Sequence, residues 1–211
     1  MFSGRPQAGL FCCRVVFIIA ILMAASLNGI PGVAKTVALT SAGAIAAPVE
    51  CLLLSGHGKL ILTGNLVGEA RDSAQVALSL ARSRARTFGI DPADFLRTDV
   101  HIHIPGGGVA RKGGPSAGLA MFVALVSAMI RKPVDPRMAF TGELSLTGEV
   151  LAVDGISKKA RAAVAAGMTH LLIPHGNSLG TRGLTGKSAE NLKIALVKTV
   201  DEALEISGMK K

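Results

Sequence analysis

The sequence predicts an α+β (irregular α/β) fold in a single domain. Segments with helical spacing of apolar residues alternate with short apolar segments typical of strands, but without a strict β-α-β order. The chain has 211 residues, of which 49% are hydrophobic, enough to bury a sizeable core. Aromatic residues make up only 3%, which disfavours a base-stacking nucleic-acid surface or a sugar-binding cleft.

The N-terminal residues have the layout of an export signal. Residues 15–27 are apolar apart from one serine, and they follow Arg5 and Arg14. A basic region before an apolar run of this length is typical of a signal peptide, and a span needs about 20 residues. We therefore expect a cleaved signal peptide or an uncleaved membrane anchor over residues 1–34, with small-residue cleavage sites at 32–34 or 44–46. The body would then lie outside the cytoplasm, periplasmic or secreted.

The segment that follows is rich in small residues, and residues 35–48 are interpreted as a linker to a body over 49–211. In the body, apolar segments 49–54 and 59–63 flank the sequence SGHG, which predicts a hairpin. Alanines and leucines recur at helical spacing from 70 to 85, and a glycine at 89 ends that helix.

The middle of the body predicts a strand, a glycine-rich loop and a buried helix. Residues 99–105 (DVHIHIP) alternate in polarity, which places His101 and His103 on one face of a strand. The loop over 106–114 leads into an apolar helix from Pro115 to about residue 131.

The last third of the body predicts alternating strands and helices. The expected elements are strands over 138–146 and 149–153 around a Thr147-Gly148 turn, a helix capped by Ser157 and ended by Gly167, strands over 169–174 and 192–197, and a helix with a capping box of Thr199 and Glu202.

Neither the charge nor the cysteine content excludes many classes of function. The formal net charge is +9, and residues 50–211 carry 20 basic and 14 acidic side chains. The basic residues are scattered, apart from Arg82, Arg84 and Arg86 on a predicted helix surface, so a solvated face is favoured over a nucleic-acid site. Cys51 is expected to be a buried strand residue, because the three cysteines have neither metal-ligand nor disulfide spacing.

Several catalytic and binding motifs are absent. The segment GLTGKS at 183–188 lacks the first glycine of a phosphate loop, because position 181 is threonine. The five histidines have no metal-ligand spacing, and no G-x-S-x-G sequence occurs. We therefore expect no nucleotide site, metal or other cofactor.

A serine and a lysine remain as candidates. Ser116 follows Pro115 at the start of the predicted helix, where it is either a cap or a group beside free backbone N–H donors. Lys158 and Lys159 begin an alanine-rich helix. They are either two solvated lysines or include one that packing desolvates, which would lower its pKa.

Three motifs in order resemble a known family. GGPSAGLAM (113–121), TGELSLTGEVLAVDGISKKARAA (141–163) and LLIP are similar to the proteolytic domain of Lon proteases, the S16-type Ser–Lys peptidases. The resemblance extends upstream through LTGNLVGEARDSAQVALSLARSRA and covers about residues 49–207. It implies a ribosomal protein S5 domain 2-like fold, polypeptide substrates and a homo-oligomer, in many members a hexameric ring.

The resemblance also implies roles for individual residues. Ser116, with Gly114 and Ala117 beside it, is the nucleophile, and Lys159 is the base, with Lys158 only its neighbour. Thr141 matches a threonine that helps hold the lysine, and Glu143 matches a nearby acidic position. The chain departs from the family at Gly113, where an acidic residue is usual, and in a longer 106–112 loop. No ATPase motif occurs.

The resulting expectation is an ATP-independent serine endopeptidase for unstructured polypeptides, served by a separate recruiting partner if unfolding is needed. The alternative is a binding or assembly module with the same fold and no peptidase activity. A nucleic-acid-binding domain is disfavoured by the lack of aromatic residues. The membrane would be a partner only through an uncleaved N-terminus.

Overall fold

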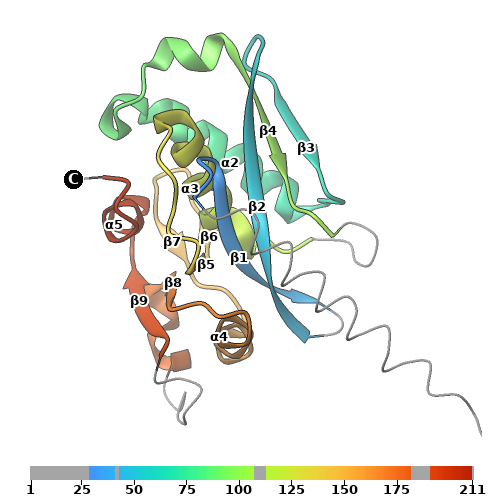
Figure 1. Ribbon diagram of the computed structural model, residues 1–211, viewed down its shortest axis with the longest axis vertical. Coiled ribbons are helices and arrows are strands. Elements are labelled where there is room, and N and C mark those ends of the chain that lie inside the picture. Colours follow the sequence, from blue (N-terminus) through green and yellow to red (C-terminus); the bar gives the residue numbers. More distant parts are fainter. Residues whose placement is uncertain (1–28, 41–42, 107–112, 182–190, 211) are drawn as a thin grey trace, which may run out of the picture.

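A computed structural model describes residues 29–40, 43–106, 113–181 and 191–210, and it arranges them around one mixed sheet (Figure 1). The strands are β1 (Val33–Thr40), β2 (Gly43–Ser55), β3 (Leu60–Thr63), β4 (Thr98–His103), β5 (Met138–Phe140), β6 (Glu143–Leu144), β7 (Val150–Leu151), β8 (His170–Pro174) and β9 (Lys193–Val197). The helices are α2 (Glu69–Ser83), α3 (Gly118–Ile130), α4 (Ile156–Ala165) and α5 (Val200–Ile206), with 3-10 helices η1 (Ala85–Phe88), η2 (Pro92–Leu96), η3 (Pro115–Ala117) and η4 (His175–Thr181).

Seven strands form the main sheet in the order β3-β4-β2-β1-β5-β8-β9. The pairs β1–β2 and β2–β4 are antiparallel, whereas the β3–β4, β1–β5, β5–β8 and β8–β9 pairs are parallel. Strands β6 and β7 form a separate antiparallel hairpin around a turn at Gly148. This mixed topology, with helices between parallel strands, confirms the predicted α+β class.

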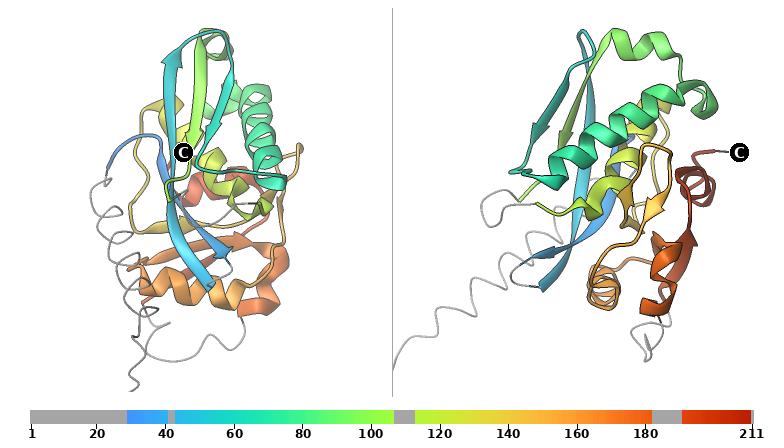
Figure 2. Two further views of the ribbon diagram at one scale, coloured as in Figure 1. Left: turned by 90° about the vertical axis from the view of Figure 1, so that its right-hand side faces the viewer. Right: turned by 180° about the vertical axis from the view of Figure 1, so that it is seen from behind.

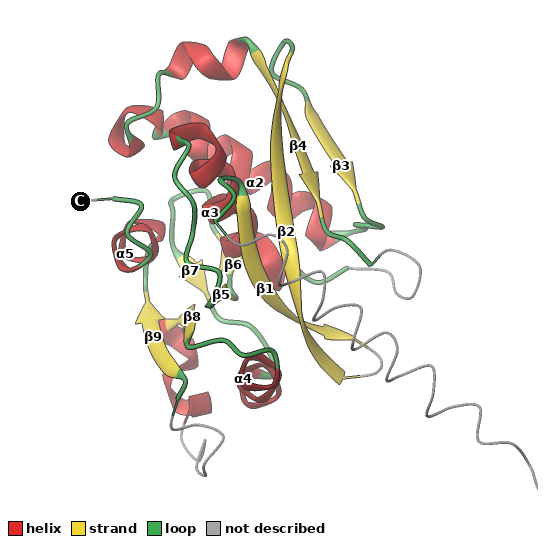
Figure 3. Ribbon diagram, viewed as in Figure 1, coloured by secondary structure: helices red, strands yellow, loops and turns green. Residues whose placement is uncertain are grey.

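Helices cover both faces of the sheet, as the turned views of Figure 2 and the secondary-structure colours of Figure 3 show. On one face, α2, α3 and α5 share a core with inward residues of β1, β2 and β4. On the other face, α4 packs against Val37, Ala139, Leu171 and Ile173. Helix α3 lies in the middle of the first core and is buried from residue 118 to 128, which explains why its sequence is apolar all round.

The predicted linker over residues 35–48 is wrong. These residues form most of β1 and the first half of β2, which pair from Val33↔Glu50 to Thr40↔Gly43. Thr36 and Val37 in β1 are almost fully buried, because helices lie over both faces of this central strand. The small residues of β2 from 43 to 47 are half-buried or exposed, so the pairing with β1 holds them in the sheet. The body accordingly begins at about residue 33, not at 49.

The predicted hairpin across SGHG is also wrong. Strands β2 and β3 are joined by this turn, but β4 lies between them and pairs with both. The turn is tied to the inserted strand, since one carboxylate oxygen of Asp99 accepts hydrogen bonds from the backbone N–H groups of His57 and Lys59, both at 2.8 Å. A longer-range strand pairing therefore replaces the local one.

Residues 1–28 of the expected export signal lie outside the described residues, and its end at 33–34 forms the start of β1. Among those the structure describes, no helix is long and apolar enough to cross a membrane. Both candidate cleavage sites, at 32–34 and 44–46, fall within or beside β1 and β2. Cleavage at 44–46 would remove the whole of β1 from the sheet.

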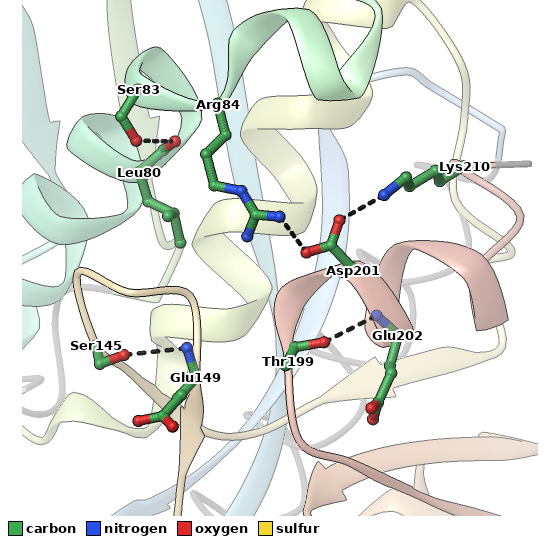
Figure 4. A network of polar contacts seen from close by, with 9 residues as sticks. All are labelled: Leu80, Ser83, Arg84, Ser145, Glu149, Thr199, Asp201, Glu202 and Lys210. Carbon is green, nitrogen blue, oxygen red and sulfur yellow. Dashed lines mark hydrogen bonds and ion pairs between the residues drawn. The ribbon is translucent and has the colours of Figure 1, made fainter.

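The C-terminal helix α5 is joined to the end of α2 by charged side chains (Figure 4). The carboxylate of Asp201 accepts from the Arg84 guanidinium and from the Lys210 ammonium, the latter at 2.6 Å. Thr199 caps α5 by accepting from Glu202 N at 3.3 Å, as expected. The other half of the predicted capping box is absent, because the Glu202 carboxylate accepts from Lys198 N instead.

We expect Asp201→Asn to lower the free energy of unfolding by about 1 kcal/mol, the scale of a partly buried ion pair. Burial alone would raise the pKa of Asp201, but the hydrogen bonds from Lys210 and Arg84 outweigh it and hold that pKa below the usual value. The stabilisation is therefore present above the unfolded carboxyl pKa and lost as pH falls through the folded one. Urea unfolding at pH 7 and pH 3 measures it. A difference between variant and wild type that is equal at both pH values would contradict the assignment.

Candidate active site

Ser116 lies in the short 3-10 helix η3, which leads directly into α3. Its carbonyl oxygen accepts from Gly142 N at 2.9 Å and from the Thr141 hydroxyl at 3.2 Å. A side chain at Gly142 would place its Cβ 2.6 Å from Val150, so the close approach requires glycine there. The serine is half-buried, with an exposed Gly114 before it and a buried Ala117 after it. Ser116 is thus fixed against the segment that follows β5.

Lys159 points into the protein from α4. The buried residues of this helix are Ile156, Lys159, Ala160 and Ala163, which recur at the spacing of one helix face. Lys159 is only 1% exposed, whereas Lys158 is exposed. The Lys159 ammonium donates to the hydroxyl of Thr141 at 2.9 Å, which is the contact expected for this threonine.

These contacts form one continuous chain from lysine to serine. Lys159 Nζ donates to Thr141 Oγ1, and the same hydroxyl donates to the carbonyl oxygen of Ser116. The structure therefore brings the Ser116 backbone, Thr141 and Lys159 together from η3, the segment after β5, and α4. Glu143 is half-buried in β6, next to this segment, and forms no ion pair with Lys159 among the described residues.

Burial lowers the pKa of Lys159 from its ordinary value to about 8, and the negative charge of Asp154 opposes this shift. A lysine with such a pKa is partly neutral at mildly alkaline pH and is then able to accept a proton. The resemblance implies only a nearby acidic position at Glu143, and the carboxylate whose charge acts on the pKa of Lys159 is that of Asp154. Its position just before Gly155, at the start of α4, was the signal that it would lie near the lysine.

Side-chain contacts of Asn177 and Ser157 hold the start of α4, and the sequence did not predict the role of Asn177. The side-chain amide of Asn177 accepts from Val153 N and donates to Val153 O, both at 2.9 Å. Ser157 was predicted to cap α4, but it lies inside the helix and donates to the carbonyl of Gly180. The Asn177 contacts join η4 to the turn that carries Asp154, and the Ser157 contact joins η4 to α4 itself. An amide side chain soon after the buried strand β8 was the available signal.

The remaining candidate groups lie elsewhere. His101 and His103 share one face of β4, as predicted, and each ring forms a hydrogen bond with the Thr63 hydroxyl, at 2.9 and 2.7 Å. Cys51 is buried in β2, which raises its pKa to about 12. No group of three or more histidine, cysteine or acidic residues within the described ranges is suited to a metal ion. GLTGKS and most of the 106–112 loop fall outside those ranges.

One protein family and several individual proteins are similar in sequence to this chain. The sequence profile of the family described as Lon protease (S16) C-terminal proteolytic domain matches residues 23–209. Lon protease of Methylocella silvestris is 44% identical over 175 residues, covering 83% of this chain and 22% of that protein. Lon protease of Phenylobacterium zucineum is 40% identical, with 84% and 22% covered, and that of Mycoplasma genitalium is 39% identical, with 80% and 21% covered. The chain spans about a fifth of the length of these relatives.

Proposed function

Because this chain belongs to the Lon protease (S16) C-terminal proteolytic domain family, we propose that it is a serine-type endopeptidase with Ser116 as nucleophile and Lys159 as base. The observation that carries this proposal is the buried Lys159, whose pKa is lowered to about 8 and whose ammonium contacts Thr141 beside Ser116. A lysine that is buried without a carboxylate partner is costly to keep charged. Burial of the amine is expected for a lysine that acts as a base, and it is not expected for a lysine that only faces solvent.

The proposed reaction proceeds through an acyl-enzyme. Neutral Lys159 takes the proton of the Ser116 hydroxyl as the oxygen attacks the carbonyl carbon of the scissile peptide bond. The lysine then gives this proton to the departing amine, and a water molecule, deprotonated in the same way, releases the acyl group. The role of Thr141 is to hold the Nζ atom by accepting one of its hydrogen bonds, which orients the lone pair of the neutral amine.

We further propose that substrates are unstructured polypeptides and that hydrolysis by this chain needs no ATP, since its 211 residues contain no phosphate-loop sequence. The purified chain is expected to cleave a reduced and carboxymethylated protein equally fast with and without ATP. The same protein in its folded, disulfide-bonded form should resist. Cleavage that appears only on adding ATP would contradict this part of the proposal.

Assembly and recruitment are proposals that rest on the family alone. We propose that the chain forms a homo-oligomer, in the form of a hexameric ring. We also propose that a separate partner delivers folded proteins to it. Light scattering of the purified chain tests the first point: a mass near 21.6 kDa at micromolar concentration would contradict it.

We propose that residues 15–27 direct the body across a membrane, because a basic region precedes this apolar run. Alkaline phosphatase fused to the C-terminus of the full chain is expected to be active only if the body is exported. Deleting residues 2–27 should abolish that activity. Green fluorescent protein fused at the same place, which folds in the cytoplasm, gives the opposite readout, and fluorescence with an inactive phosphatase would rule out export.

A further inference from the structure

The 3-10 helix η4 lies against both parts of the proposed active site. It follows β8 directly, and the last residue of that strand, Pro174, contacts Gly142: a Cβ on this glycine would be 3.4 Å from the proline ring. The N–H of Gly142 is the group that donates to the carbonyl oxygen of Ser116. At the other end of η4, a Cβ on Gly180 would be 3.4 Å from Ile156, the first residue of α4. Helix η4 therefore connects the serine segment to the helix that carries the lysine.

Asn177, within η4, binds the main chain of a single residue through both ends of its side-chain amide. The amide oxygen accepts from Val153 N and the amide NH₂ donates to Val153 O, both at 2.9 Å. Val153 is buried and lies just after β7, where the short β6–β7 hairpin has ended. A buried main-chain group that loses its hydrogen-bond partner is costly, so both ends of this amide are needed to hold Val153.

Val153 leads directly into the turn that starts α4. Asp154 follows it, and then Gly155, which has a φ of 71° in the left-handed region and would be 2.7 Å from Leu39 if it carried a Cβ. The carbonyl of Gly155 accepts from Lys159 N at 2.9 Å, which begins the hydrogen bonding of this helix. Because the turn is close-packed and short, the position of Val153 determines how deeply the first turn of α4 is buried.

The depth of Lys159 matters because burial lowers its pKa to about 8. Within the described residues, Asp154 is the one charge that acts on this pKa, and it opposes the effect of burial. Other ionisable side chains on α4 and on the elements packed against it do not contribute: Lys158, Arg161, Lys35, Glu50, His170 and His175. A change in burial is therefore the main way in which a neighbouring segment would alter the protonation of this lysine.

We propose that Asn177 is a positioning residue for the base: by binding both polar main-chain groups of Val153, it keeps the first turn of α4 packed and the Lys159 side chain buried beside Thr141. Asn177 acts through the main chain of Val153 and not on the substrate. Its importance for catalysis rests on the proposed function. Its effect on the lysine is independent of catalysis and is measured separately.

The first test measures the protonation of Lys159 without any peptide hydrolysis. In the full chain carrying Ser116→Ala, trace acetylation by acetic anhydride, located by mass spectrometry, follows the neutral form of each lysine as pH is raised. We expect a midpoint near 8 for Lys159. Adding Asn177→Ala should raise this midpoint by about one pH unit, because a less buried amine returns toward its ordinary pKa. Asn177→Asp should raise it at least as much, since it loses the donor to Val153 O and adds a negative charge.

The second test measures kcat/KM of the chain with an intact Ser116 against pH on a fluorescent peptide. Asn177→Ala should lower kcat/KM about tenfold at pH 7, where the neutral lysine is the minor form, and should lower it much less at pH 10. The loss should appear in kcat, with KM nearly unchanged. A role limited to stability would instead lower the activity by one factor at every pH.

Asn191→Ala is the matched control, because Asn191 is an exposed asparagine just before β9, and it should leave both midpoints unchanged. Ser157→Ala removes only the contact with Gly180 and should shift them less than Asn177→Ala does. A folded Asn177→Ala variant, as judged by thermal unfolding, with an unchanged acetylation midpoint would overturn the proposal. If that variant does not fold, the same comparison with Asn177→Asp decides. A shifted acetylation midpoint in a chain that cleaves no peptide would contradict the proposed function and support the role of Asn177.

Discussion

Ser116→Ala and Lys159→Ala are each expected to abolish cleavage of an unstructured polypeptide, with kcat reduced by about 10³-fold or more. The serine would supply the attacking oxygen, and the buried Lys159, whose Nζ contacts Thr141 next to Ser116, would supply the base. Because the two act on one proton transfer, the double variant should be no slower than either single variant. Initial rates on a fluorescent peptide and on a reduced, carboxymethylated protein measure the effect.

The design includes controls for folding and for the choice of lysine. Lys158→Ala should keep most of the activity, because Lys158 is exposed one position away. Lys159→Met keeps a side chain of similar volume and removes a charge that is unfavourable to bury, so it should be inactive and unfold at a temperature no lower than the wild type. Survival of activity in Lys159→Met, or its loss in Lys158→Ala, would contradict the assigned base. An active Ser116→Ala variant would favour a different nucleophile.

The pH dependence of kcat/KM should follow the protonation of Lys159. Burial lowers its pKa to about 8, so the neutral form, which accepts the serine proton, becomes the major form above that pH. Activity should rise as pH increases through about 8 and stay high into the alkaline range. At pH 6 the neutral fraction is about one hundredth, which predicts a loss of about 100-fold relative to pH 10.

A second variant tests the cause of this midpoint. The charge of Asp154 raises the pKa of Lys159 against the effect of burial, so Asp154→Asn should move the midpoint to lower pH. His101→Ala and His103→Ala should leave it unchanged, since both rings contact Thr63 and not the proposed site. A midpoint near 6.5, the ordinary value for histidine, that disappears with one of these variants would assign the base to that histidine.

Local sequence patterns predicted the positions of α2 and α3 and the face of β4, although α2 ends at Ser83 and not at Gly89. The spacing of alanines and leucines located α2, and the apolar run after Pro115 located α3, because side-chain periodicity is a property of one element. The alternation in DVHIHIP placed His101 and His103 on one face of β4 for the same reason. The family resemblance singled out Ser116, Thr141 and Lys159, which the structure then brings together.

Strand order and the environment of the lysine depended on the tertiary structure. Residues 35–48 suggest a linker because small side chains are common in linkers, whereas their place in the sheet depends on pairing with distant strands. The insertion of β4 between β2 and β3 depends on pairing between distant segments, which no local pattern encodes. Likewise, the sequence places Lys158 and Lys159 side by side. Only the packing of α4 decides which of the two side chains is buried, and burial away from water is what lowers the pKa of Lys159.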